Sequence, residues 1–236
     1  VKMHVNINLL MRLTKPVETA VGPISAGRHI YKREPSFPIA VACDPAFNIV
    51  YEANIRYLHH LGEVTYFSPL ADTSLPDAGF VYLPGGYPEL YLAALSANRQ
   101  MLQSIRRYVE SGGKLLAECG GMMYLCDEIR DKNGDVYPMA GVLHQSATME
   151  NMKLRLGYRT LLYNETRLKG HEFHYSRLVE QQNPLPSCAV AYTAKGVETD
   201  TPLYHYKNVW AGYTHLYWAD PVGNEWFTKF VIDGNT

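Results

Sequence analysis

The sequence predicts an α/β fold with a mostly parallel central sheet, helices on both of its faces, and antiparallel additions in the second half of the chain. Two observations predict this fold. Between Ile39 and Leu125, short apolar runs alternate with amphipathic runs of helical period, and glycines mark the joints. After Ile129, the chain changes to alternating runs rich in tyrosine and threonine, which are typical of antiparallel strands.

The first half is predicted to contain four buried strands. They are the apolar runs 39–43, 64–67, 80–83 and 114–118. A helix over residues 51–61 is expected to end at Gly62 in a left-handed C-cap. A second helix carries its apolar face within residues 101–109 and ends before Gly112, and a third begins near Met122.

The second half is predicted to add an antiparallel region. Its strands are residues 136–143, 155–163, 171–179 and 188–194. Residues 209–212 return to the pattern of a core strand, and the aromatic residues within 226–231 predict a final amphipathic helix.

The domain organisation follows from where regular alternation begins. Residues 1–36 contain scattered prolines and mixed charge, so we predict a linker or the remnant of an upstream domain. Residues 37–236 are predicted to form one domain, because 47% hydrophobic content in a chain of 236 residues can bury a sizeable core.

Composition excludes several classes of partner. The formal net charge is −1 and no Lys/Arg run occurs, so we expect neither nucleic-acid nor membrane-surface binding. No apolar run approaches the length of a membrane span. Four cysteines without C-x-x-C spacing, and the lack of a secretory signal, favour a reducing, cytoplasmic location.

Cys119 is the candidate nucleophile. It lies between the predicted strand 114–118 and the helical run that begins at Met122, with Gly120 and Gly121 directly after it. A tight turn from strand to helix exposes a side chain, and the helix N-terminus stabilises a thiolate. We therefore expect the pKa of this thiol to be below its ordinary value of about 8.5.

His215 is the candidate base. It follows the core strand 209–212 on a segment that this strand would place at the carboxyl edge of the sheet, which is the edge expected for Cys119. A cysteine nucleophile needs a base within hydrogen-bond reach.

Gly85 and Gly86 follow the strand 80–83 and should lie at the same edge, with Tyr87 next in the chain. Paired glycines can present backbone N–H groups to developing negative charge, and Gly120 would supply a second donor. The three glycines are therefore predicted to form an oxyanion hole.

Two other motifs do not predict a bound group. His171 and His174 lie three residues apart in a predicted strand, so they point to opposite faces and do not match the helical H-E-x-x-H zinc pattern. Residues 22–29 resemble a phosphate loop only in their glycines, because Arg28 and His29 replace the required Lys and Ser/Thr. We predict no metal site and no ATP site in this chain.

Three motifs resemble class I glutamine amidotransferase domains of the cobyric acid branch, a family of flavodoxin-like α/β fold. They are residues 85–89 (GGYPE), 118–125 (ECGGMMYL) and 170–176 (GHEFHYS). Residues 44–48 and 67–76 make the chain similar to the C-terminal, glutaminase domain of cobyrinic acid a,c-diamide synthases. The resemblance runs from about Pro38 to the C-terminus.

The resemblance implies that Cys119 attacks the side-chain amide of glutamine to form a thioester, with His215 activating the thiol. Ammonia would pass to an upstream synthetase domain that uses ATP and Mg²⁺ to amidate the a- and c-carboxylates of cobyrinic or hydrogenobyrinic acid in cobalamin biosynthesis. Residues 1–36 would be the last segment of that domain, or the connection to it. The strand that holds His171 and His174 would border the glutamine pocket.

The resemblance implies glutamine, the synthetase domain and its corrinoid as partners, and no cofactor in this chain itself. The oligomeric state stays open, a homo-oligomer included. Two positions depart from the family pattern. Tyr217 stands where triad amidotransferases have glutamate, so a Cys-His dyad is expected, and Cys43 precedes Asp44 where a basic residue is common.

Two alternatives remain open from the sequence. The domain could feed a different ATP-dependent ligase, such as one that amidates a peptidoglycan precursor, or it could be a non-catalytic docking domain. The residues encoded before Val1 would distinguish the corrinoid client from the first alternative. Labelling of Cys119 by a glutamine-analogue electrophile would distinguish a catalytic domain from the second.

Overall fold

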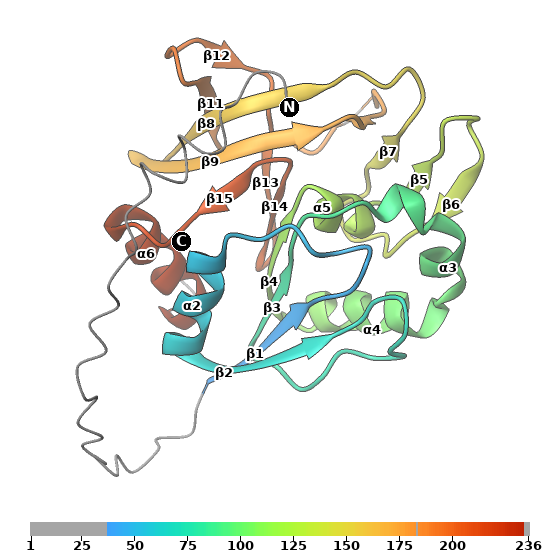
Figure 1. Cartoon of the computed structure of the whole chain (residues 1–236), viewed down its shortest axis with the longest axis horizontal. Helices are drawn as coiled ribbons and strands as arrows, with labels where there is room; N and C mark the ends of the chain where they lie inside the picture. Colours follow the sequence, from blue (N-terminus) through green and yellow to red (C-terminus); the bar gives the residue numbers. More distant parts are fainter. Residues whose placement is uncertain (1–36, 183, 234–236) are drawn as a thin grey trace, which may run out of the picture. The chain divides into compact units, whose positions relative to one another are not determined.

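The central element of the fold is a six-stranded sheet with the order β13-β14-β4-β3-β1-β2 (Figure 1). The computed structural model describes residues 37–182 and 184–233. The six strands are β1 (Phe37–Ala42), β2 (Gly62–Phe67), β3 (Phe80–Leu83), β4 (Lys114–Glu118), β13 (Leu203–Tyr206) and β14 (Val209–Gly212). All neighbours pair in parallel except β13 and β14. The predicted α/β class is confirmed, whereas the prediction for residues 1–36 lies outside the described residues.

Helices cover both faces of this sheet. They are α2 (Glu52–Leu61), η1 (Pro88–Leu90), α3 (Leu92–Ala97), α4 (Arg99–Glu110), α5 (Gly120–Leu125), α6 (Pro221–Thr228) and the π-helical turn η2 (Lys229–Asp233). Successive residues of β4 point to opposite faces: Leu115 packs in the core with Ile105 of α4, and Leu116 packs with Leu58 of α2 and Phe227 of α6. The sheet is therefore buried on both sides.

Two smaller sheets extend the second half of the chain. A five-stranded antiparallel sheet has the order β12-β11-β8-β9-β15, and a four-stranded sheet has the order β10-β7-β5-β6. Their strands are β5 (Glu128–Arg130), β6 (Val136–Pro138), β7 (Ser146–Thr148), β8 (Arg155–Tyr163), β9 (Thr166–His174), β10 (Arg177–Leu178), β11 (Val190–Thr193), β12 (Glu198–Thr199) and β15 (His215–Tyr217). The antiparallel additions thus lie in the second half of the chain, as predicted, although several of their strands were not predicted individually.

One predicted strand is shifted: β9 begins at Thr166 rather than at His171. Tyr163 pairs with Thr166, so β8 and β9 are joined by the two-residue turn Asn164-Glu165. Both turn residues have positive φ, 43° and 69°, as the favoured hairpin turn requires. The turn lacks the glycine that signals such hairpins in a sequence. The predicted start of this strand, at His171, is therefore wrong.

Two further local predictions are wrong. Gly62 is not a left-handed C-cap: its φ is −169°, and it pairs with Phe37 as the first residue of β2. The predicted strand 136–143 ends at Pro138, because residues 140–143 bond instead to the free carbonyls at the end of α5. This buried segment takes the place of a helix cap.

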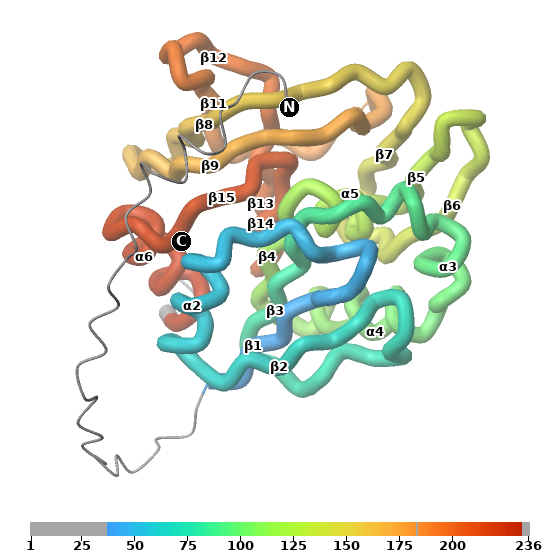
Figure 2. The backbone as a smooth tube through the Cα atoms, viewed as in Figure 1, coloured from blue at the N-terminus to red at the C-terminus, as the bar shows by residue number. Residues whose placement is uncertain are grey.

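The parallel strands bring distant parts of the sequence to one carboxyl edge. The smooth tube in Figure 2 shows β14, from the last part of the chain, beside β4. Gly212 pairs with Glu118, so the segment that leads to His215 leaves the sheet next to Cys119, while Gly85 follows the neighbouring strand β3. This edge is where ligands bind in open α/β sheets. None of the helices in the described ranges has the length and apolar character needed to cross a membrane.

Candidate active site at Cys119

Cys119 forms a tight turn between β4 and α5, as predicted. Its backbone is in an unusual region for a residue with a side chain, with φ 49° and ψ −107°. Two hydrogen bonds hold the turn: the N–H of Cys119 donates to the carbonyl of Gly212 at 2.8 Å, and the N–H of Met123 donates to the carbonyl of Cys119 at 3.0 Å. Such a backbone conformation costs about 1–3 kcal/mol and is typical of functional sites.

The thiol of Cys119 is buried rather than exposed. Only 4% of the residue is accessible, and Sγ lies 3.9 Å from the carbonyl oxygen of Phe173. Burial, reinforced by the nearby carboxyl of Glu89, raises the pKa of Cys119 to about 12. The prediction of a lowered pKa is therefore wrong for this arrangement, because α5 has only six residues and the loss of hydration outweighs the N–H of Gly120.

The segment 173–176 closes over the sulfur. The cavity beside Cys119 measures about 10 Å³, roughly the space needed for a single water molecule. Its walls are Gly86, Tyr87, Glu89, Met123, Phe173, His174, Tyr175 and Ser176. Any substrate larger than water must displace part of this wall to reach the thiol.

His215 lies at the start of β15 and is also buried, with 2% of the residue accessible. Burial lowers the pKa of His215 to about 3, and the neighbouring imidazoles of His171 and His174 act in the same direction. The ring is therefore neutral at pH 7. Among the described residues, Nε2 of His215 has no hydrogen-bond partner, and no hydrogen bond joins this ring to Cys119.

The predicted oxyanion glycines have different environments. A Cβ placed on Gly120 would lie 3.1 Å from the amide nitrogen of Gly86, so these two residues are adjacent beside the sulfur. Gly85 instead supports His215, because a Cβ on Gly85 would lie 2.0 Å from Cε1 of that ring. Only glycine leaves room for the imidazole at this position.

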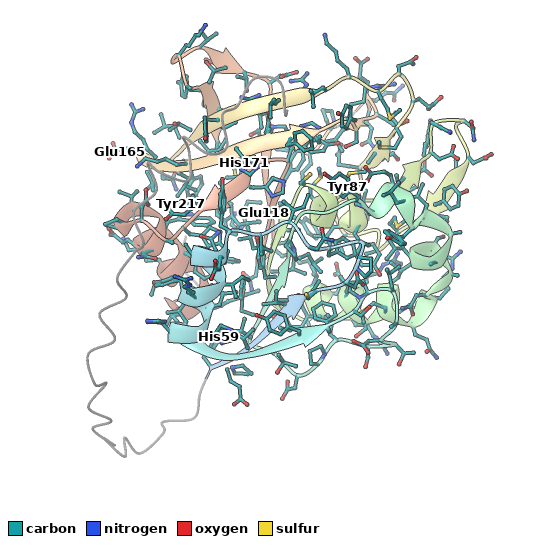
Figure 3. The ribbon with its side chains drawn as sticks, in the orientation of Figure 1. His59, Tyr87, Glu118, Glu165, His171 and Tyr217 are labelled. Carbon is teal, nitrogen blue, oxygen red and sulfur yellow. The ribbon has the colours of Figure 1, made fainter. Side chains whose placement is uncertain are left out.

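His171 and His174 point to opposite faces of β9, as their spacing predicts. The ring of His171 stacks on His215, with centroids 4.8 Å apart, and accepts or donates a 2.6 Å hydrogen bond with the hydroxyl of Tyr51. The ring of His174 stacks on Tyr213 at 3.8 Å and lines the cavity at Cys119. Figure 3 labels His171 on β9 of the antiparallel sheet.

Glu118 is a site residue that the sequence reasoning missed. Its buried carboxylate accepts hydrogen bonds from the hydroxyl of Tyr82 at 2.6 Å and from the N–H of Leu216 at 3.0 Å. Burial raises the pKa of this carboxyl to about 7. The signal was available, because a carboxylate within the apolar run 114–118 needs buried partners.

Asn54 of α2 fixes the same strand from the other side. Its side-chain amide donates to the carbonyl of Leu216 at 2.8 Å and accepts from the N–H of Trp218 at 3.1 Å. Asn54 is fully buried. Together with Glu118, it satisfies the backbone of β15 next to His215, which sets the position of that strand.

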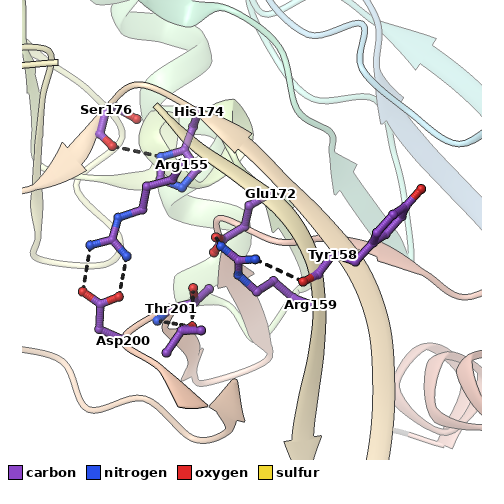
Figure 4. Close-up of polar contacts among 9 residues, drawn as sticks. Arg155, Tyr158, Arg159, Glu172, His174, Ser176, Asp200 and Thr201 are labelled. Atoms are coloured by element: carbon purple, nitrogen blue, oxygen red, sulfur yellow. Dashed lines mark hydrogen bonds and ion pairs between the residues drawn. The ribbon is translucent and has the colours of Figure 1, made fainter. Parts of the chain in front are cut away.

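A second, larger cavity adjoins the first. It has a volume of about 350 Å³ and shares His174 and Ser176 with the cavity at Cys119. Figure 4 shows its charged wall, where Arg155 forms a double ion pair with Asp200 (Nη2 to Oδ2, 2.8 Å). Next to it, buried Glu172 pairs with Arg159 at 2.6 Å. Within residues 37–182 and 184–233, no cluster of three or more His, Cys, Asp or Glu residues could hold a metal ion.

Comparisons with known proteins agree on one family. Residues 38–222 match the family described as CobB/CobQ-like glutamine amidotransferase domain. The hydrogenobyrinate a,c-diamide synthase of Pseudomonas aeruginosa is 40% identical over 185 residues, covering 76% of this chain and 41% of that protein. The cobyrinate a,c-diamide synthase of Fusobacterium nucleatum is 39% identical over 188 residues, again 76% of this chain and 41% of that protein. The chain thus spans less than half the length of these relatives.

The fold is also found among solved structures. The structure of PurLQS from Thermotoga maritima matches with a TM-score of 0.53, covering 84% of this chain and 96% of that chain. The sequence identity is 16%, so this likeness concerns the fold alone.

Proposed function

The chain belongs to the CobB/CobQ-like glutamine amidotransferase domain family, and we propose that it hydrolyses glutamine at Cys119 and supplies ammonia to an ATP-dependent synthetase that amidates corrin carboxylates. The observation that carries this proposal is the turn at Cys119, with its φ of 49° and the adjacent Gly86 and Gly120. A nucleophile on such a turn can attack a carbonyl whose oxygen meets backbone N–H groups.

In the proposed reaction, Sγ of Cys119 attacks the side-chain carbonyl carbon of glutamine while His215 accepts the thiol proton. The tetrahedral intermediate then expels ammonia, which takes that proton from the imidazolium, and a glutamyl thioester remains. A water molecule that is deprotonated by His215 attacks the thioester, and glutamate and the free thiol are released. The N–H groups of Gly86 and Gly120 would stabilise the oxyanion in both steps.

The closed site is in a resting state. A pKa of about 12 for Cys119 and about 3 for His215 leave both groups neutral at pH 7. Proton transfer between two such groups is strongly unfavourable, so in this proposal it follows displacement of the segment 173–176 by glutamine, which changes the burial of both groups. A resting thiol of this kind also limits reaction with other electrophiles.

The charged cavity beside Cys119 fits the other end of glutamine. An α-amino acid carries a carboxylate and an ammonium group, and the cavity offers the guanidinium of Arg155 and the carboxylates of Glu172 and Asp200. Because His174 and Ser176 line both cavities, displacement of the segment 173–176 would join them into one pocket. We assign recognition of the amino-acid end to this wall.

The client of the ammonia is proposed from the relatives. Both are named a,c-diamide synthases of cobyrinate or hydrogenobyrinate, and each is more than twice as long as the part that this chain matches. The remaining length is enough for a synthetase domain that binds ATP, Mg²⁺ and the corrinoid. In this proposal, the chain itself needs no cofactor.

The decisive experiment uses the complete enzyme with its synthetase. Cys119→Ala should abolish glutamine-dependent amidation and leave ammonia-dependent amidation unchanged, with Cys43→Ala, at an exposed cysteine, as the matched control. Glutamine-dependent activity that survives in Cys119→Ala would exclude Cys119 as the nucleophile. Loss of both activities, with no change for Cys43→Ala, would point to a docking role instead.

A further inference from the structure

The imidazole of His215 is contacted at one edge and on one face. At its Cε1 edge lies Gly85, where even a methyl group would come within 2.0 Å of Cε1. On a face of the ring stacks His171, 4.8 Å away between centroids and inclined by 14°. The two contacts leave the ring little freedom to tilt.

No polar group holds this ring within residues 37–182 and 184–233. Nε2 of His215 has no hydrogen-bond partner there. The nearby carboxylate of Glu118 is committed to Leu216 and Tyr82, and the ring of Tyr217 packs edge-on against Tyr51 at 5.3 Å. Packing, rather than a hydrogen bond, therefore sets the orientation of the candidate base.

His171 is itself firmly placed. It lies in the middle strand of three, paired with Tyr158 of β8 and with His215 of β15. The hydroxyl of Tyr51 meets Nδ1 of His171 at 2.6 Å, and the Tyr51 ring contacts the His171 ring edge-on at 5.5 Å. The contacts run from Tyr51 through His171 to His215.

We propose that His171, anchored by Tyr51, is the positioning residue of His215 and orients the base by ring stacking. In triads, a carboxylate that is hydrogen-bonded to the imidazole has this task. The assignment rests on the proposed function for the role of His215 as a base. The contacts among Tyr51, His171 and His215 do not depend on that function. This role differs from the predicted role of His171 in glutamine binding, and His171 is not among the residues that line the small cavity at Cys119.

The test compares His171→Ala, which removes the stack, with His171→Phe, which keeps an aromatic ring, and with Tyr51→Phe, which removes the anchoring hydrogen bond. Aromatic contacts of this kind correspond to about a two- to tenfold effect. We expect His171→Ala to lower kcat for glutamine hydrolysis by about that factor with KM unchanged, and His171→Phe to restore most of it. Tyr51→Phe should lie between the two.

A second readout does not depend on glutamine. The rate of Cys119 alkylation by iodoacetamide, followed by mass spectrometry from pH 6 to 10, should change in His171→Ala toward the profile of His215→Ala and stay near wild type in His171→Phe. Thermal unfolding shows that each variant is folded. A dependence of alkylation on His171 in a protein that turns over no glutamine would refute the proposed function and keep the positioning role.

Two results would overturn the inference. One is a folded His171→Ala variant with wild-type kcat and alkylation profile. The other is a rise in the KM for glutamine, in both His171 variants, with kcat unchanged, because that pattern belongs to a residue that binds substrate.

Discussion

The carboxylate of Glu118 accepts a hydrogen bond from the backbone N–H of Leu216 at 3.0 Å, although 98 residues separate the two in the chain. Glu118 directly precedes Cys119, and Leu216 directly follows His215. This one buried bond therefore connects the two halves of the candidate site. The hydroxyl of Tyr82 holds the other carboxylate oxygen at 2.6 Å.

Removing the carboxylate of Glu118 should weaken the connection between the segments of Cys119 and His215 without unfolding the sheet. We expect Glu118→Leu to lower the free energy of unfolding by about 1–3 kcal/mol, because the N–H of Leu216 loses its buried acceptor. Glu118→Gln keeps an acceptor oxygen and should retain most of the stability and most of the Cys119 alkylation rate. Urea titration and the alkylation assay measure both effects. Equal behaviour of the two variants would contradict the role of the Leu216 bond.

Gly85→Ala should disable the site by crowding. Its new methyl group would push the imidazole of His215 away, since the two would otherwise be 2.0 Å apart. Overpacking of this kind costs about 1–3 kcal/mol, and we expect a loss of glutamine hydrolysis that exceeds the loss of stability. Gly79→Ala is the control, because its methyl group would meet the ring of Phe37 at 2.5 Å, away from the site. Comparable activity in the two variants would show that Gly85 has no special part.

The stability of the protein should depend on pH through His215. Its pKa falls from 6.5 to about 3 on folding, so the unfolded chain binds the extra proton first as the pH drops. The contribution of the neutral ring is complete above pH 6.5 and is lost as the pH falls toward 3. For one proton the slope is at most about 1.4 kcal/mol per pH unit.

His215→Gln isolates this contribution, because buried Glu118, with its raised pKa of about 7, acts in the opposite direction in both proteins. The difference in unfolding free energy between wild type and His215→Gln should become less favourable to wild type between pH 6.5 and 3. A constant difference over this range would mean that His215 has the same pKa in the folded protein as in the unfolded chain.

Arg155→Ala should weaken glutamine binding selectively. Loss of a guanidinium that holds a carboxylate costs about 1.5–3 kcal/mol, so the KM for glutamine should rise roughly tenfold or more while kcat changes little. Lys207→Ala is the matched control, because it breaks a comparable surface ion pair, with Glu110, elsewhere in the fold. An unchanged KM in Arg155→Ala would show that residues other than Arg155 recognise the amino-acid end of glutamine.

The parallel core was predictable because its signals are local. The runs 80–83 and 209–212 coincide with β3 and β14, since glycine, proline or asparagine marks the ends of both runs. The turn at Cys119 followed from the same logic. Local periodicity also placed β8 at residues 155–163, where alternation is regular.

What could not be predicted depends on contacts between distant segments. Cys119 is covered by residues 173–176, at the end of β9 and just after it, so the sequence around Cys119 suggested an exposed thiol of lowered pKa. The cavity wall at Arg155 and Asp200 joins residues that are 45 positions apart and share no motif. The partners of Glu118 and His171 likewise become visible only when β15 is placed beside β9.

The hydrogen bond from Cys119 to Gly212 has a consequence for biosynthesis. The carbonyl of Gly212 in β14 is made 93 residues after Cys119, and the chain is synthesised from its N-terminus. A nascent chain that has finished β4 but not β14 cannot close the backbone bend around the sulfur. The reactive geometry is therefore assembled only after residue 212 has been made, and truncated products that end before it should carry an ordinary thiol.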